Sequence, residues 1–255
     1  MTHNMLKDIQ LLFMRKLMET RRNPVFMFMS LTTPLLYLIL FAPLLKSLTF
    51  SKTFPTNNVL TVFVPGMLTL VAFGGGLFVG FGIIEELRSG VIERFRVTPI
   101  SRFSILAGMV LQDVVVTLAS AMFFILIALP FGFRINIAGL ALLIVLLGLL
   151  VATTSSFSYA VGLITKSEDK LAPITHGINM PLTLLSGMML PMSLAPTWLK
   201  TIAHFNPVYY VVEAARHLTV GELTDINVGY AFLFMIPVTC FVMWWATRVF
   251  SKAVM

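Results

Sequence analysis

The sequence predicts an all-α integral membrane protein, and composition is the first observation behind this prediction. Of the 255 residues, 58% are hydrophobic and only 11% are charged, whereas soluble domains carry about 25% charged residues. A soluble fold could not bury this much apolar surface beneath a polar exterior. A lipid bilayer is therefore the expected solvent.

Six long runs free of Asp, Glu, Lys and Arg are the second observation. Each is long enough to cross the hydrocarbon core as a helix, and the runs cover residues 25–45, 59–84, 114–133, 135–165, 171–199 and 226–247. The fourth and fifth runs exceed what one span needs, so each is expected to include interfacial or re-entrant backbone. Six crossings would place both termini on one side.

The distribution of Lys and Arg is the third observation, because these residues accumulate on cytoplasmic segments. With both termini inside, most of the 18 basic residues fall on cytoplasmic segments, and the outer segments keep only Lys46, Lys52, Arg134, Lys200 and Arg216. We therefore expect a multi-pass protein of the cytoplasmic (inner) membrane of a prokaryote, with both termini cytoplasmic. The net charge of +7 then reflects loop orientation, and no nucleic-acid partner is expected.

The first 24 residues have the pattern of an amphipathic helix at the inner membrane interface. Apolar residues recur at helical spacing from Met5 to Leu17, and basic residues share the remaining surface. This pattern predicts an interfacial helix within residues 1–24, in contact with lipid headgroups. The alternative is a solvated basic tail. The region lacks a cleavable signal pattern, so we expect it to remain on the mature protein.

A patterned segment, residues 85–113, separates the second and third runs. It mixes both signs of charge, and Val91, Ile92, Phe95 and Val97 give a short helix an apolar side. Pro99 would end that helix, and Ser101 could cap the next one. Such a helix is suited to docking in a groove of a soluble partner, and the alternative is a solvated turn.

Two motifs resemble one family. The run GVIERFRVTPISRFSILAG, residues 90–108, resembles the first cytoplasmic loop of ABC-2 type transporter permeases, the membrane subunits of drug and polysaccharide exporters. The run FNPVYYVVEAAR, residues 205–216, is similar to the pattern that follows the fifth span in that family. The resemblance covers essentially the whole chain and implies a single ABC-2 type transmembrane domain over residues 1–255.

The resemblance also implies partners and site residues. It implies a second permease copy, as a homo- or heterodimer, and two copies of a cytosolic ABC ATPase subunit, which the N-terminal helix would also contact. The coupling helix would lie in the cytoplasmic loop 85–113, with ATPase contacts from Val91, Ile92, Glu93, Arg94, Phe95 and Arg96. Short helices that dip into the outer leaflet between spans five and six would occupy residues 195–221.

No phosphate-binding loop of the form G-x-x-x-x-G-K-[ST] occurs in the sequence. We therefore expect no cofactor in this chain, with ATP and Mg²⁺ bound by the partner subunit, and no catalytic residue here. The expected function is ATP-driven export of an amphiphilic drug, peptide antibiotic or lipid-linked molecule. Alternatives are a lipid-linked glycan exporter or, in another class, an ATPase-independent channel or a membrane enzyme.

Polar residues in the fifth run are candidates for the wall of a translocation path. These are His176, Asn179, Thr183 and Ser186, and plain helix packing is the alternative for each. Glu213 and Arg216 are three residues apart on a predicted helix, so they are expected to pair, either structurally or in contact with substrate. The histidines lack an H-E-x-x-H motif or a Cys partner, so no metal site is expected.

The second run is rich in glycine, with a G-x-x-x-G motif at residues 76–80. Small residues allow close helix approach in lipid. This favours structural packing, and the sharper hypothesis is a span that bends or tilts when the ATPases close.

Overall fold

The computed structural model describes residues 5–22, 32–40, 59–94 and 100–253, and every regular element within these ranges is helical. The all-α prediction is therefore confirmed for the described chain. Residues 32–40 are helical, and the labelled helices are α1 (Met5–Arg22), α3 (Val59–Leu77), α4 (Gly80–Arg88), α5 (Val91–Arg94), α6 (Arg102–Ala128), α7 (Ile137–Thr165), α8 (Glu168–Ser186), α9 (Thr197–Ala203), α10 (Pro207–Val220) and α11 (Ile226–Ala253).

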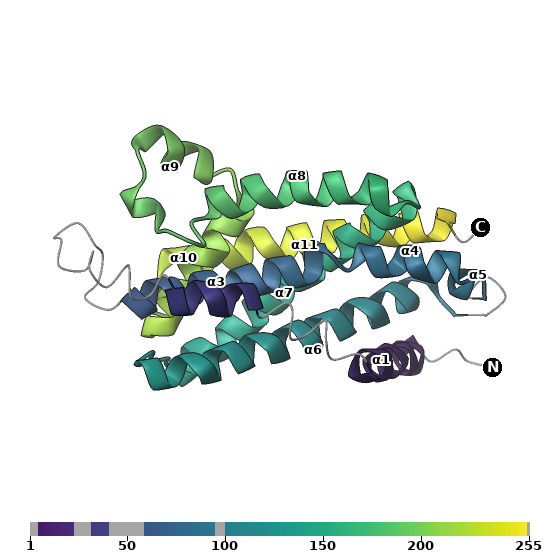
Figure 1. Cartoon of the computed structure of the whole chain (residues 1–255), viewed down its shortest axis with the longest axis horizontal. Helices are drawn as coiled ribbons and strands as arrows, with labels where there is room; N and C mark the ends of the chain where they lie inside the picture. Colours follow the sequence, from purple (N-terminus) through teal and green to yellow (C-terminus); the bar gives the residue numbers. More distant parts are fainter. Residues whose placement is uncertain (1–4, 23–31, 41–58, 95–99, 254–255) are drawn as a thin grey trace.

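The long helices run side by side along one axis (Figure 1). Helix α7 lies at the centre and contacts α3, α6, α10 and α11. Helices α1 and α5 lie at one end of the bundle together with the end of α11, whereas α9 and α10 lie at the other end. The two ends of the described chain therefore share one end of the bundle.

Within the described residues, four stretches are long and apolar enough to cross a membrane: Val59–Arg88, Arg102–Phe131, Ile137–Thr165 and Ile226–Ala253. Helix α8 has 19 residues, and at 1.5 Å per residue it reaches roughly 28 Å, close to the thickness of a hydrocarbon core. Its first turn contains Glu168, Asp169 and Lys170, which lowers its hydropathy. The first predicted span lies largely outside the described residues, so six spans stay a prediction.

The described part of segment 85–113 is largely helical, because α4 continues to Arg88 and α6 begins at Arg102. Ser101 caps α6 as predicted, since its side chain accepts a hydrogen bond from the Ser104 N–H. Asp113, which comes directly before the third uncharged run, lies within α6, and its carboxylate is buried beside Tyr159 inside the bundle. The fourth run was expected to include interfacial or re-entrant backbone, and within it α7 is one continuous helix of 29 residues.

The fifth run is divided as expected. Helix α8 ends at Gly187, which has a φ of 77°, a left-handed conformation that glycine adopts without steric cost. A 3₁₀ turn, Met192–Leu194, and helix α9 follow. Helices α9 and α10 are the short helices predicted within residues 195–221.

The second span is broken between α3 and α4, at Phe78 and Val79. Ser158 of α7 lies against this break. Its Oγ donates to the carbonyl of Leu77 at 2.5 Å and accepts from the N–H of Gly80 at 2.9 Å. A Cβ at Gly80 would lie 2.5 Å from the Ser158 carbonyl oxygen, so only glycine permits this approach of α4 to α7.

Candidate functional site

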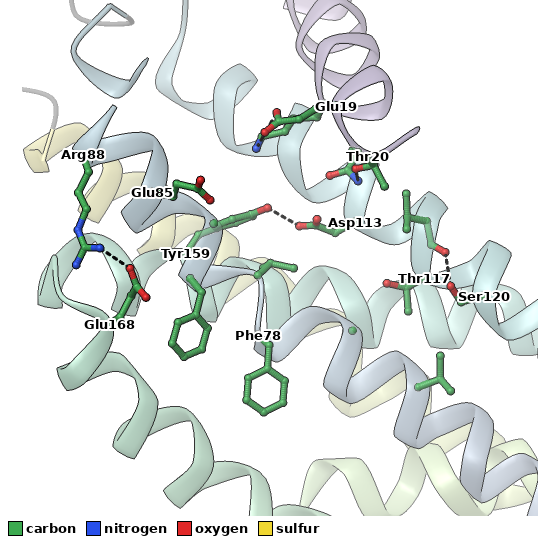
Figure 2. Close-up of a pocket in the computed structure, with 18 residues that line it drawn as sticks. Glu19, Thr20, Phe78, Glu85, Arg88, Asp113, Thr117, Ser120, Tyr159 and Glu168 are labelled. Atoms are coloured by element: carbon green, nitrogen blue, oxygen red, sulfur yellow. Dashed lines mark hydrogen bonds and ion pairs between the residues drawn. The ribbon is translucent and has the colours of Figure 1, made fainter. Parts of the chain in front are cut away.

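A cavity of about 620 Å³ lies near the end of the bundle where α1 meets α4 and α6 (Figure 2). This volume is within the range of pockets that hold drug-sized ligands, roughly 300–1,000 Å³. Its lining residues come from α1, α3, α4, α6, α7 and α8. The polar ones are Lys16, Glu19, Thr20, Glu85, Arg88, Gln112, Asp113, Thr117, Ser120, Tyr159 and Glu168, and the others are Val71, Gly75, Phe78, Val79, Phe81, Gly82 and Val116.

An ion-pair cluster joins α1 to α4 at this cavity. Lys16 Nζ pairs with Glu86 Oε1 and lies 3.4 Å from Glu19 Oε2, while Arg15 Nη2 lies 3.8 Å from Glu86 Oε1. Burial acts to lower the pKa of Lys16, but the charges of Glu86 and Glu19 outweigh this effect and raise the pKa above its ordinary value. Lys16 therefore stays charged at neutral pH.

Asp113 lies deeper in the same cavity. Tyr159 Oη of α7 donates to Asp113 Oδ2 at 2.7 Å, and Asp113 is only 7% exposed. Among the described side chains, no Lys or Arg forms an ion pair with this carboxylate. Next to it, Gln112 Nε2 donates to Thr20 Oγ1 at 2.9 Å, which ties α6 to α1.

The rim of the cavity is polar as well. Arg88 Nη1 of α4 donates to Glu168 Oε1 of α8 at 2.6 Å, and both side chains are exposed. Glu85 is exposed near this pair. The cavity thus combines a charged rim, a buried carboxylate and an apolar wall from α3 and the break that follows it.

The predicted coupling residues lie only partly within the described structure. Ile92 is 2% exposed and packs with Ile83, Ile105 and Leu163 in the protein's own core. This corrects the expectation that Ile92 faces the ATPase, since its side chain instead anchors α5 to the permease. Val91 is half-buried. The side chains of Glu93 and Arg94, and all of Phe95 and Arg96, lie outside the described residues.

The predicted path residues on α8 do not line this cavity. His176 is exposed, and its ring lies 5.2 Å from that of Phe78, centroid to centroid. Thr183 Oγ1 donates to Asn179 Oδ1 at 3.3 Å, and Ser186 Oγ donates to the Thr183 carbonyl at 2.8 Å. These hydroxyls are satisfied within their own helix, so their role in a path stays a prediction.

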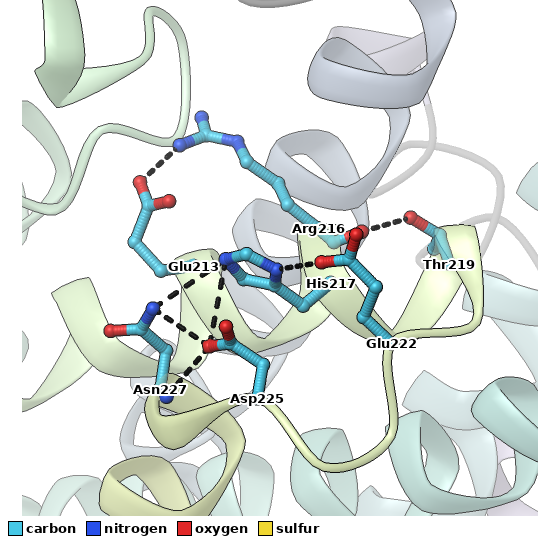
Figure 3. A network of polar contacts seen from close by, with 7 residues as sticks. All are labelled: Glu213, Arg216, His217, Thr219, Glu222, Asp225 and Asn227. Atoms are coloured by element: carbon cyan, nitrogen blue, oxygen red, sulfur yellow. Dashed lines mark hydrogen bonds and ion pairs between the residues drawn. The ribbon is translucent and has the colours of Figure 1, made fainter.

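Glu213 and Arg216 form the pair expected from their spacing, with Arg216 Nη1 and Glu213 Oε1 2.5 Å apart (Figure 3). Arg216 also donates from Nε to the Val62 carbonyl at 3.3 Å and from Nη2 to the Gly187 carbonyl at 2.5 Å. The guanidinium thereby connects α10 to α3 and to the end of α8. These contacts favour the structural interpretation over substrate contact.

A second polar cluster lies beside this pair in Figure 3. His217 Nδ1 is 2.6 Å from Glu222 Oε2, and His217 Nε2 is 3.7 Å from Asp225 Oδ1. One ligand atom from each of these three side chains lies within 4.8 Å of the other two, a spacing at which the three could hold a metal ion. The contacts also connect the end of α10 to the start of α11.

The polar cluster of Lys16, Glu86, Asp113 and Tyr159 is not evident from the sequence pattern. Charge counting places the first three on interfacial and cytoplasmic segments, because each interrupts or precedes an apolar run. A usable signal was present, since residues 103–112 before Asp113 are all uncharged. A helix that begins at the predicted cap Ser101 would carry Asp113 about three turns into the bundle.

The fold and the site define a class, namely a helical membrane protein with a polar cavity among its spans. The model of the ABC-2 type transporter family matches residues 7–220, and the chain belongs to this family. It is thus an ABC transporter membrane subunit, and the family resemblance inferred from the two motifs is confirmed.

Individual relatives agree with this assignment. The chain is 28% identical over 245 residues to a protein named transport permease ycf38 of Cyanophora paradoxa, with 91% of this chain and 84% of the relative covered. A ycf38 protein of Pyropia yezoensis is 26% identical, with 85% and 75% covered. A daunorubicin resistance ABC transporter permease protein, DrrB1 of Streptomyces coeruleorubidus, is 25% identical, with 84% and 76% covered.

Proposed function

We propose that this chain is the permease subunit of an ATP-driven exporter that moves an amphiphilic molecule out across the cytoplasmic membrane. The observation that carries the proposal is the ABC-2 family match over residues 7–220 in a sequence that has no phosphate-binding loop. Nucleotide hydrolysis then belongs to a separate ATPase, present in two copies with a second permease. The name of the Streptomyces relative, which refers to daunorubicin resistance, supports an amphiphilic substrate.

The linkage between helices suggests how ATPase closure would reach the membrane spans. Helices α1 and α5 lie at the same end of the bundle, and the Lys16–Glu86 pair connects α1 to α4. Helix α4 is separated from α3 by the break at Phe78 and Val79. A push on α1 or α5 would therefore tilt α4 about this break and change the cavity that α4 lines.

Membrane placement follows the charge distribution. We propose six crossings, with the end that carries α1 and α5 in the cytoplasm, because the segments there contain most of the Lys and Arg residues. Helix α8 would be the fifth crossing, and α9 and α10 would dip into the outer leaflet.

The test is co-expression with a candidate ABC ATPase subunit that carries a phosphate-binding loop. We expect the two proteins to co-purify, the permease alone to hydrolyse no ATP, and inverted vesicles that contain both to accumulate an amphiphilic dye when ATP is added. The control is an ATPase variant whose phosphate-binding lysine is replaced by alanine, which should abolish accumulation. ATP hydrolysis by the isolated permease, or equal dye uptake with the variant ATPase, would contradict the proposal.

A further inference from the structure

We infer that the cavity among α1, α4 and α6 is a binding site for an amphiphilic organic cation, with Asp113 as the carboxylate that faces the positive charge. The inference rests on the proposed function and specifies its substrate class. It stands on three features of the described residues: the charge of the lining, the position of Asp113 and the apolar wall.

The lining has an excess of negative charge. It contains the carboxylates of Glu19, Glu85, Asp113 and Glu168 against the cations Lys16 and Arg88. Both cations are already engaged, Lys16 by Glu86 and Glu19, and Arg88 by Glu168. If Glu86 and its second ion-pair partner, Arg15, are counted with the lining residues, there are still five carboxylates against three cations. An anionic headgroup would meet uncompensated carboxylates here, whereas a cation would meet complementary charge.

Asp113 is the carboxylate that we expect to face the bound cation. Its carboxylate is buried within α6 and accepts a hydrogen bond from the neutral Tyr159 hydroxyl. An acidic side chain inside a membrane span is costly unless it is paired, and such residues commonly mark substrate pathways. A ligand cation in the cavity would supply the opposite charge that the described side chains around Asp113 do not provide by ion pairing.

The remaining wall suits the apolar part of such a ligand. Val71 and Val116 line the cavity from α3 and α6, and the rings of Phe78 and Phe81 line it from the break and α4. These side chains offer apolar contact to a ligand, and the ring of Phe78 points away from Asp113 (Figure 2). Carboxylates beside aromatic and aliphatic side chains therefore match a hydrophobic cation better than a hydrated inorganic ion.

The experiment uses two probes of the same shape and opposite charge, tetraphenylphosphonium and tetraphenylborate. The full permease with its ATPase partner is placed in nanodiscs, and binding of each probe is measured by equilibrium dialysis against empty nanodiscs, without nucleotide. We expect saturable binding of tetraphenylphosphonium and no saturable binding of tetraphenylborate. Asp113→Asn should weaken it by about tenfold or more, since tenfold in affinity is only about 1.4 kcal/mol.

Further variants separate binding from folding. Glu85→Gln changes an exposed carboxylate at the rim and should weaken binding of the cation less than Asp113→Asn, without altering thermal stability. Glu222→Gln, at the other end of the bundle, is the matched control and should bind like the wild type. Equal affinity of the wild type for the two probes would overturn the inference. So would wild-type binding of tetraphenylphosphonium by both single variants, Glu85→Gln and Asp113→Asn.

Failure of the cation site can be told apart from failure of the proposed function. Binding is measured without ATP, whereas export is tested by ATPase pairing and vesicle uptake. A complex that pairs with its ATPase and transports a neutral dye, yet binds no tetraphenylphosphonium, would refute the cation site and leave the exporter intact.

Discussion

Ser158 satisfies two backbone groups that a break in a membrane helix would otherwise leave unpaired. The Leu77 carbonyl and the Gly80 N–H lie on either side of the break, and the Ser158 hydroxyl contacts both. Water cannot replace these hydrogen bonds in a buried position, and an unsatisfied backbone group there is expensive. One side chain of α7 thus satisfies the backbone groups on both sides of the break between α3 and α4.

We predict that Ser158→Ala destabilises the protein by about 1–3 kcal/mol, the cost of leaving buried polar groups unsatisfied. Ser156→Ala is the matched control, because Ser156 is buried on the same helix and its hydroxyl has no hydrogen-bond partner among the described residues. Thermal unfolding in detergent should show a lower midpoint for Ser158→Ala alone. An equal loss in both variants would mean that volume matters at these positions and the hydroxyl does not.

Single residues also show where sequence reasoning reached its limit. The Glu213–Arg216 pair was predictable, because three-residue spacing on a helix is a local property. The bonds from Arg216 to Val62 and Gly187 were not, since these partners lie 154 and 29 residues away. Asp113 was assigned to a loop for the same reason, because its partner Tyr159 is 46 residues away.

Helix α1 is attached to the rest of the protein by both apolar and ionic contacts. Leu12 is buried in a core cluster with Ile105 and Met109 of α6, and Lys16 reaches Glu86 of α4. The side chain of Glu86 is only 8% exposed. Lys16 and the more distant Arg15 are the cations that pair with this buried carboxylate. An amphipathic helix that merely rested on lipid would need no such pair.

We predict that Lys16→Met destabilises the protein by about 3–5 kcal/mol, because it leaves the buried Glu86 carboxylate without its main partner. The double variant Lys16→Met with Glu86→Gln should lose less than Lys16→Met alone, since no buried charge then remains. Hydrogen exchange measures the local loss of stability in α1, and thermal unfolding measures the loss of global stability in each variant. Strictly additive losses would show that the two side chains do not interact.

The same pair has a defined pH dependence. Because the folded pKa of Lys16 is raised above the ordinary 10.5, its stabilising contribution is fully present below pH 10.5 and is lost as pH rises through the folded value. Protection of α1 from exchange should therefore fall on the alkaline side in the wild type and not in the double variant.

At the level of elements, periodicity predicted α1 and the cap residue Ser101 predicted the start of α6, whereas charge counting placed Asp113 outside the span. The apolar positions of α1 repeat along one helix, so the pattern is local. Asp113 and Gln112 lie within α6 with Tyr159 and Thr20 as their hydrogen-bond partners. A count of charged residues treats every carboxylate as a boundary, whereas a carboxylate with a buried partner can lie within a helix.

For the whole molecule, the two ends of the bundle differ in kind. The end with α1 and α5 holds the cavity and its ion pairs, while the end with α9 and α10 is joined by Arg216 and by the His217 contacts. Helix α7 connects both ends through contacts with α3, α6, α10 and α11. In the proposed mechanism, the ATPase would push on the end that holds α1 and α5, where α4 lines the cavity.

The crossing of α8 decides between the six proposed spans and a smaller number. If α6, α7 and α8 all cross, then Ser101 and Asp169 lie on the cytoplasmic side and Thr224, which follows α10, lies outside. We predict that an impermeant maleimide labels Thr224→Cys in intact cells, and labels Ser101→Cys and Asp169→Cys only after permeabilisation. Cys240, which is exposed in the described chain, must first be replaced by Ser. Labelling of positions 169 and 224 from the same side would show that α8 does not cross, because α8 is the one long helix between them. Labelling of position 101 from outside would mean that the orientation derived from Lys and Arg is inverted.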